Sequence, residues 1–291
     1  MEVPVSPTPE LIANYQCLCG EGPIWHPDEG RLYWLDIDTG RIFRYEPATG
    51  RHEQIYEGEH IGGITIQADG SLALYGPRGL VDGWREGRIT TLVESIPGEE
   101  ERRFNDCIAD PEGRVFAGTL GQGMGNLYRI DPDGSVTHIV GDVGCSNGMG
   151  FTPDLAGLYY VDSVAGIVYL FDYDRATGGL TNQRIWLQVD TALGIPDGMT
   201  LDAEGFVWVA FWDGHRVTRY DPATAEPVAT IEVPARKASC LIFGGPEMTD
   251  IYISTALGGG DPSLEGEHAG GLFRVNIGIR GVPEFRSRIG L

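Results

Sequence analysis

The sequence predicts an all-β protein, a six-bladed β-propeller with four-stranded blades, for two reasons. With 43 Gly and 18 Pro in 291 residues, the chain is divided into many short segments, which is typical of turn-rich all-β proteins. A unit of about 42 residues also recurs along the chain. This period leaves room for four short strands and is characteristic of one propeller blade. We therefore expect residues 1–291 to form a single propeller domain.

The repeated unit is a strand, a Gly-containing turn and a second strand that ends near Tyr-Asp-Pro. Apolar and polar residues alternate within these strands, and this period of two indicates half-buried β-strands. Clear copies of the unit cover residues 31–50, 158–178 and 207–224, and weaker copies cover 71–89, 114–134 and 250–276.

One position recurs just before each copy, and we call these positions the leading column. Its members are 41, 43, 42, 50 and 42 residues apart, and they are Glu21, Gly62, Asn105, Asn147, Asp197 and Ser239. A single four-stranded unit leaves its faces exposed, so six units are expected to close into a ring, with residues 11–17 lending an outer strand to the last blade. A pair of β-sandwiches is the alternative fold, but it would not explain the constant offset between the column and the following strand.

The leading column predicts a metal site. The first strand of each propeller blade lines the central channel, so equivalent positions converge around its axis. Two carboxylates and two amides would meet there, while the glycine and the serine leave space. Unpaired carboxylates in a narrow channel repel one another, and a cation removes that penalty. Oxygen ligands favour a hard divalent cation such as Ca²⁺, Mg²⁺ or Mn²⁺, with open positions for water and substrate.

Each column residue also has a simpler interpretation. Asn147-Gly148 and Asp197-Gly198 are common turn-forming pairs, and Glu21 alone would be a solvated surface charge. The common phase of these residues in the repeat favours the metal site over the separate interpretations.

Composition excludes several classes of partner. The formal charge is −21 and the pI is about 4.5, so nucleic acid and anionic membranes are not expected as partners; solubility is the plainer reading of this charge. The five cysteines lack a Cys-x-x-Cys pair and are expected to be reduced. No signal peptide or membrane-spanning run is apparent, so we expect a cytoplasmic protein, either a monomer or a small homo-oligomer.

Six short motifs surround the leading column and its strands. They lie at residues 20–25 (Gly-Glu-Gly-Pro-Ile-Trp), 103–106 with 110–114, 146–149, 195–199 with 202–205, 243–246 and 269–273. In this order and spacing, the sequence resembles the SMP-30/gluconolactonase/regucalcin family over nearly its whole length. The resemblance implies a six-bladed propeller that hydrolyses sugar lactones, such as glucono- or xylono-lactone, with a divalent metal ion.

The resemblance also implies roles for individual residues. Glu21, Asn147 and Asp197 would bind the metal, Asp197 would be the general base, and Arg103 and Asn105 would contact the sugar hydroxyls. One ion is expected as cofactor, with Ca²⁺ favoured over Zn²⁺, Mn²⁺, Mg²⁺ and Fe²⁺. Two departures leave the sugar open: Cys107 stands where relatives often have Gly, and residues 120–125 lack an acid that contacts substrate in some relatives.

Two other functions fit the same column, a phosphotriesterase-like hydrolase and a non-catalytic, calcium-binding regulatory propeller. Serine-based hydrolysis is disfavoured, because the chain lacks a Gly-x-Ser-x-Gly elbow and no His lies in the column. The roles of His60 and of the Gly-rich segments 118–125 and 257–271 stay open, although the second is expected to rim the face that carries the site.

Overall fold

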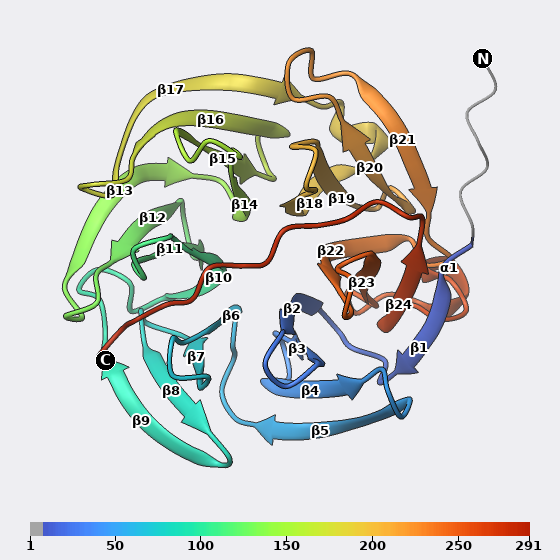
Figure 1. Cartoon of the computed structure of the whole chain (residues 1–291), viewed down its shortest axis with the longest axis horizontal. Helices are drawn as coiled ribbons and strands as arrows, with labels where there is room; N and C mark the ends of the chain where they lie inside the picture. The colour runs from blue at the N-terminus through green and yellow to red at the C-terminus, as the bar shows by residue number, and fades with distance from the viewer. Residues whose placement is uncertain (1–7) are drawn as a thin grey trace.

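The computed structural model describes residues 8–291, which form six four-stranded antiparallel sheets arranged in a ring (Figure 1). The predicted six-bladed propeller is therefore confirmed. Blade 1 comprises β2 (Gly20–His26), β3 (Arg31–Asp36), β4 (Arg41–Glu46) and β5 (Arg51–Glu57), blade 2 β6 (Gly63–Ile66), β7 (Leu72–Tyr75), β8 (Val81–Arg85) and β9 (Arg88–Val93), and blade 3 β10 (Arg102–Ala109), β11 (Val115–Gly121), β12 (Gly125–Ile130) and β13 (Val136–Val143). Blade 4 comprises β14 (Ser146–Phe151), β15 (Gly157–Asp162), β16 (Ile167–Asp174) and β17 (Gly179–Gln188), blade 5 β18 (Ile195–Leu201), β19 (Val207–Trp212), β20 (Arg216–Tyr220) and β21 (Pro227–Glu232), and blade 6 β22 (Lys237–Gly244), β23 (Asp250–Ala256), β24 (Gly271–Asn276) and β1 (Glu10–Asn14).

The ring is closed by the first strand of the chain. In blade 6, β1 pairs antiparallel with β24 and so supplies the outer strand, with Glu10 opposite Arg274 and Asn14 opposite Gly271. The expected closure by the N-terminal segment is confirmed, although the strand ends before residue 15 instead of reaching residue 17. Because β1 joins β22, β23 and β24, the last blade has four strands, as each of the other five blades does.

Buried aromatic and aliphatic side chains hold the blades together. Trp34, Trp208 and Tyr252 are at most 2% exposed and lie in the largest core cluster, which joins blades 1, 5 and 6. The alternation seen in the sequence produces this arrangement, because each blade turns one apolar face toward each neighbouring blade. The described residues contain two helices, a 3₁₀ turn, η1 (Thr191–Leu193), and α1 (Pro262–Glu265). None of the helices in residues 8–291 has the length and apolarity to cross a bilayer.

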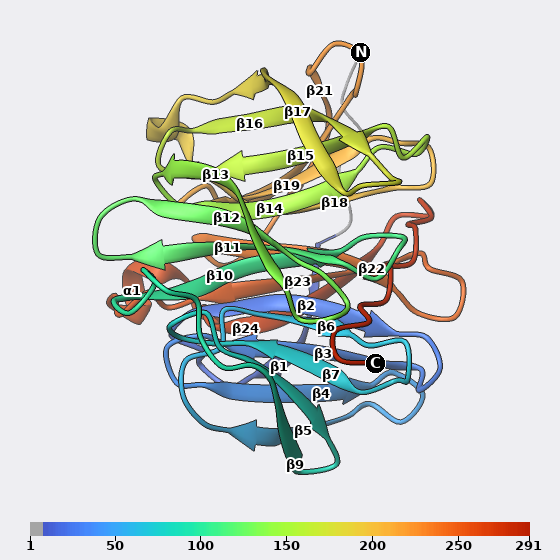
Figure 2. The same cartoon turned by 90° about the vertical axis from the view of Figure 1, so that its left-hand side faces the viewer.

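The C-terminal segment, residues 277–291, crosses one end of the ring (Figure 1). The Arg280 carbonyl accepts a hydrogen bond from Ala203 N in blade 5, and Ser287 N donates to Ile66 O in blade 2. Viewed edge-on, this segment and α1 lie on opposite sides of the ring (Figure 2). The channel is therefore covered at one end by the chain itself.

Gly62 in the leading column serves close packing between blades 2 and 3. A Cβ atom at this position would overlap the carbonyl oxygen of Phe104. We expect Gly62→Ala to lower the free energy of unfolding by about 2 kcal/mol or more, because one of two inner strands must shift. Urea denaturation measures this loss. Gly83→Ala is the control, since a Cβ there would meet its nearest neighbours at an ordinary 3.5 Å; equal losses for both variants would contradict the explanation.

Candidate functional site

A cavity of about 420 Å³ is lined by residues at the starts of the inner strands, whereas the C-terminal segment pairs with residues that follow the other ends of these strands. Four members of the leading column line this cavity: Glu21, Asn105, Asn147 and Asp197. The structure thus brings together all the residues for which the resemblance implied a role in metal or substrate binding, because Arg103 also lines the cavity, whereas Gly62 does not. Ser239 does not line the cavity; its hydroxyl donates to the Gly20 carbonyl at 2.5 Å and links blades 6 and 1.

The column residues reach the cavity because their strands are bulged. The pairing of each inner strand with its neighbour shifts between Glu21 and Ile24, between Phe104 and Asp106, and between Ser146 and Met149. A similar shift occurs in blades 5 and 6. A bulge interrupts the ladder and re-aims the side chain beside it. Five of the six blades therefore share a backbone irregularity at the start of the inner strand, whereas β6 in blade 2 pairs without a shift.

Glu21 and Asp197 place two buried carboxyl groups in the cavity. The two residues are 7% and 6% exposed; Gly22 N donates to Glu21, which also forms a hydrogen bond with the Cys240 thiol, and the Asn147 amide donates to Asp197. Burial, followed by repulsion from Asp106, raises the pKa of Glu21 to about 8. Burial and the Glu21 charge raise the pKa of Asp197 well above its ordinary value. Both carboxylates would be stabilised in their charged form by a cation.

Asn147 supplies a third oxygen to the same region. Its Nδ2 donates to Ser163 Oγ at 3.1 Å and to Asp197 Oδ1, while its Oδ1 accepts, from the part of the chain that the structure describes, only the Gly148 N–H, at 3.2 Å. Two carboxylates and one amide oxygen with free lone pairs fit a hard divalent cation that completes its shell with water or substrate. Within residues 8–291, no three His, Cys, Asp or Glu side chains are grouped to hold a metal.

Arg103 and Asn105 form a second polar group on the cavity wall. Arg103 Nη1 donates to Asn105 Oδ1 at 2.6 Å and to the Phe104 carbonyl at 2.9 Å. Asn105 Nδ2 donates to the Ser146 carbonyl at 2.8 Å, which fixes the amide between blades 3 and 4. No protein acceptor among residues 8–291 takes the Nε or Nη2 protons of Arg103. These donors are available to the oxygen atoms of a ligand.

A family model described as the SMP-30/Gluconolactonase/LRE-like region matches residues 19–257 of the chain. The protein belongs to this family. The match contains the whole leading column, and it confirms the resemblance inferred from the six motifs.

Individual relatives of the SMP-30/gluconolactonase family align over nearly the full chain. A pentonolactonase of Haloferax volcanii is 42% identical over 292 residues, which cover 96% of this chain and 98% of that protein. Regucalcin of Xenopus laevis is 34% identical, covering 94% and 96%. The crystal structure of a calcium-binding protein, regucalcin, from Agrobacterium tumefaciens superposes with a TM-score of 0.91 at 25% identity, covering 98% of each chain.

In this member of the SMP-30/gluconolactonase family, a second column that the sequence analysis missed also lines the cavity. In blades 1, 3, 4 and 5, one residue of the second strand pairs with the residue that precedes the leading-column member. The residue that follows this pairing partner along the chain lines the cavity, and the four such residues are Ile37, Leu120, Ser163 and Trp212. Trp212 is the aromatic member of this column on the cavity wall. Aligning the second strands of the repeat would have revealed this column.

Two Gly-rich segments, 118–125 and 257–271, each contribute a residue to the cavity wall. Leu120 from segment 118–125 and Gly258 from segment 257–271 line the cavity, so the second segment does rim the site as expected. His60 is exposed and is not among the cavity-lining residues.

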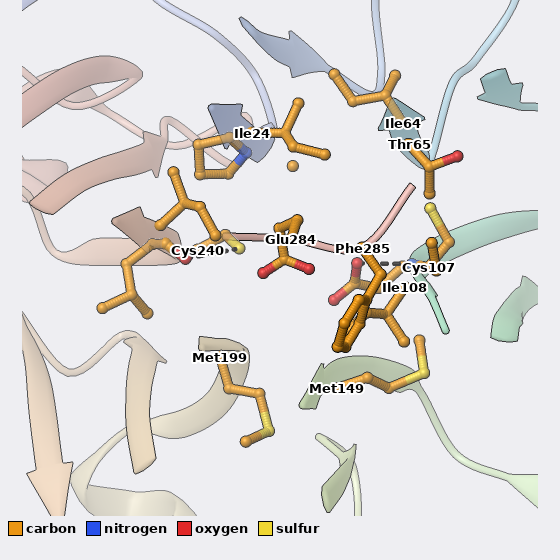
Figure 3. Close-up of a pocket in the computed structure, with 16 residues that line it drawn as sticks. Ile24, Ile64, Thr65, Cys107, Ile108, Met149, Met199, Cys240, Glu284 and Phe285 are labelled. Carbon is orange, nitrogen blue, oxygen red and sulfur yellow. Dashed lines mark hydrogen bonds between the residues drawn. The ribbon is translucent and has the colours of Figure 1, made fainter. Parts of the chain in front are cut away.

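A smaller cavity of about 50 Å³ lies deeper in the channel, against the C-terminal segment (Figure 3). Glu284 from that segment points into it among Cys240, Met149 and Met199, and Asp106 also lines it. Burial raises the pKa of Asp106 to about 7, and burial together with the Asp106 charge raises the pKa of Glu284 to about 7. Four acidic side chains therefore lie along the channel.

Proposed function

We propose that this protein hydrolyses the ring ester of sugar lactones, and that one divalent metal ion assists the reaction. The observation that carries the proposal is the cavity itself, in which two buried carboxylates and the Asn147 amide face the same space as the Arg103–Asn105 pair. The carboxylates fit a cation, and the pair offers donors for hydroxyl oxygens. A relative that covers nearly all of this chain is named a pentonolactonase.

The chain's own residues would contribute as follows. When bound by Glu21, Asn147 and Asp197, a divalent cation supplies a Lewis acid for the lactone carbonyl. Asp197 Oδ2 has no hydrogen-bond partner in residues 8–291 and would take a proton from the attacking water as general base. Arg103 and Asn105 would hold the sugar ring through its hydroxyls and so orient the ester.

We further propose Ca²⁺ as the first candidate for the ion. The donor atoms are all oxygens, and a set of only three protein ligands leaves several positions for water, which Ca²⁺ accepts readily. Several relatives are named regucalcin, and one of them is described as a calcium-binding protein. Zn²⁺, Mn²⁺, Mg²⁺ and Fe²⁺ are the alternatives, and elemental analysis of the purified protein would decide among them.

A panel of substrates tests the proposed function against its two alternatives. Pentono- and hexonolactones and a phosphotriester are each incubated with the protein, with and without chelator, and acid release is followed by pH indicator. Fast release from lactones that stops with chelator supports the proposal. Release from the phosphotriester alone would indicate a phosphotriesterase-like hydrolase. No release from either, with retained Ca²⁺ binding, would indicate a non-catalytic binding protein.

Arg103→Lys is expected to raise KM for a sugar lactone about tenfold and to leave kcat within about threefold. Lysine keeps the charge but loses the planar fork that can hold Asn105 and a substrate oxygen together. Steady-state kinetics at saturating Ca²⁺ measures the two constants. Arg78→Lys, which removes an exposed arginine paired with Glu59 at 3.0 Å, is the control and should change neither. An unchanged KM in Arg103→Lys would remove this residue from the substrate site.

A further inference from the structure

Two buried aspartates stand beside the proposed metal ligands. Asp36 ends β3 and pairs with Gly20, the residue before Glu21. Its Oδ1 accepts the Cys19 N–H at 2.9 Å, and its Oδ2 accepts the Leu18 N–H at 3.2 Å. The carboxylate thus holds the two backbone amides that lead into the strand carrying Glu21.

Blade 4 repeats this arrangement. Asp162 ends β15 and pairs with Ser146, the residue before Asn147. Its Oδ1 accepts the Cys145 N–H at 3.1 Å, and its Oδ2 accepts the Gly144 N–H at 3.1 Å. The same Oδ1 also accepts the Ala165 N–H at 3.3 Å and so ties the turn that contains Ser163, the partner of the Asn147 amide.

The equivalent positions in the other blades differ. Thr119 in blade 3, Phe211 in blade 5 and Thr255 in blade 6 occupy the same register. None of these residues has a carboxylate, so the arrangement is not a general requirement of the repeat. It occurs in blades 1 and 4, which face each other across the six-membered ring and carry Glu21 and Asn147.

We infer that Asp36 and Asp162 are positioning residues, which fix the backbone on which Glu21 and Asn147 face the metal ion. Each ligand lies at a bulge, where the ladder that follows it is interrupted. The backbone before the ligand must therefore be held by other means, and each carboxylate supplies two charge-assisted hydrogen bonds there. This inference rests on the proposed metal site, but not on the lactonase reaction.

Asparagine substitutions test the inference with little change in size. In Asp162→Asn the new side chain would keep one acceptor oxygen but turn an NH₂ group toward a backbone N–H, so one hydrogen bond is lost and two donors face each other. Loss of an orienting partner costs about 10–100-fold in metal affinity. We therefore expect Asp162→Asn and Asp36→Asn each to raise the Kd for Ca²⁺ by about 10–100-fold, measured by calorimetry with Mn²⁺ as a second probe.

Two other aspartates are matched controls. Asp110 accepts the Glu112 and Arg114 N–H groups at 2.8 and 3.0 Å, and Asp202 accepts the Glu204 and Phe206 N–H groups at 3.0 and 3.1 Å. Both are at most 1% exposed, but they follow the far ends of inner strands, beside the C-terminal segment.

The controls separate positioning from general stability. Asp110→Asn and Asp202→Asn should lower Tm at least as much as the test variants do, because each also loses an ion pair, with Arg114 or Arg219, while the Kd for Ca²⁺ changes less than twofold. If the protein proves to be a lactonase, saturating Ca²⁺ should also restore most of the kcat lost in Asp162→Asn, a recovery that damaged folding would not allow.

Each outcome decides the inference. It is overturned if the test variants lose stability but bind Ca²⁺ and Mn²⁺ as the wild type does, or if the wild type binds neither ion. A wild type that binds the ions without hydrolysing lactones would defeat the proposed function alone, and the comparison of Kd values would still stand. Asp162 has no cationic partner in residues 8–291, whereas Asp36 is paired with Arg41 at 2.8 Å, so Asp162→Asn carries the test if Asp36→Asn does not fold.

Discussion

Asp197→Asn and Glu21→Gln are each expected to lower kcat for a sugar lactone at least about a thousandfold. Asp197 would lose both its role as general base, worth about 10²–10⁴-fold, and one metal ligand, whereas Glu21 would lose a metal ligand only. Both variants should also bind Ca²⁺ too weakly to be detected by calorimetry. Steady-state kinetics and calorimetry on the same preparations give the two values.

The same substitutions should not unfold the propeller. Each removes a buried carboxyl that has few hydrogen-bond partners, Gly22 N and the Cys240 thiol for Glu21 and the Asn147 amide for Asp197, so the metal-free variants should have a higher Tm than the metal-free wild type above pH 7. Asp133→Asn, an exposed turn residue, is the control and should alter neither activity nor Ca²⁺ binding. A Glu21→Gln enzyme with wild-type kcat would show that this carboxylate is not a ligand.

The periodicity of the sequence was sufficient to predict the ring and the convergence of Glu21, Asn105, Asn147 and Asp197. This succeeds because a propeller repeats one backbone geometry, so equal phase in the repeat means equal position at the channel. Phase alone does not distinguish side chains in the cavity from those between blades. Ser239 shares the phase but bonds across to blade 1.

Other parts of the site lie beyond the reach of the repeat. The bulges depend on pairing between neighbouring strands, which no local pattern of polarity records. The C-terminal segment contains no repeat unit, and its contacts with residues more than 200 positions away, such as Gln67 with Ser287, depend on the ring being closed first. Glu284 therefore gave no signal in the sequence, although it faces the channel in the structure.

Those channel carboxylates lead to a prediction about stability and pH. We expect the Tm of the chelator-treated protein to fall by about 5–15 °C between pH 5 and pH 8. In the folded chain burial raises the pKa of Glu21 to about 8 and the pKa values of Asp106 and Glu284 to about 7, and it raises the pKa of Asp197 as well. At pH values between the unfolded and the folded pKa of these groups, the folded chain binds more protons than the unfolded chain. The free energy of unfolding therefore decreases as pH rises.

Saturating Ca²⁺ should oppose the part of this decrease in Tm that comes from Glu21 and Asp197, which line the cavity of about 420 Å³. The gain in Tm from Ca²⁺ should be small at pH 5, where protons compete for Glu21 and Asp197, and largest near pH 8. Scanning calorimetry with chelator and with Ca²⁺ across this range measures both effects. Glu284→Gln should make the Tm of the metal-free protein depend less on pH without changing the Kd for Ca²⁺. Glu284 lines the cavity of about 50 Å³ and does not line the cavity of about 420 Å³ that contains Glu21 and Asp197.

The acidity of the whole chain offers a competing explanation, which salt can separate from the first. With a formal charge of −21, surface repulsion would also lower Tm as pH rises. At 0.5 M NaCl the screening length is roughly 4 Å, which suppresses repulsion between exposed groups far more than repulsion between buried ones. If the fall in Tm persists at this salt concentration and is reduced in Glu284→Gln, it originates in the channel. If it disappears, the channel carboxylates do not determine the stability of the metal-free protein.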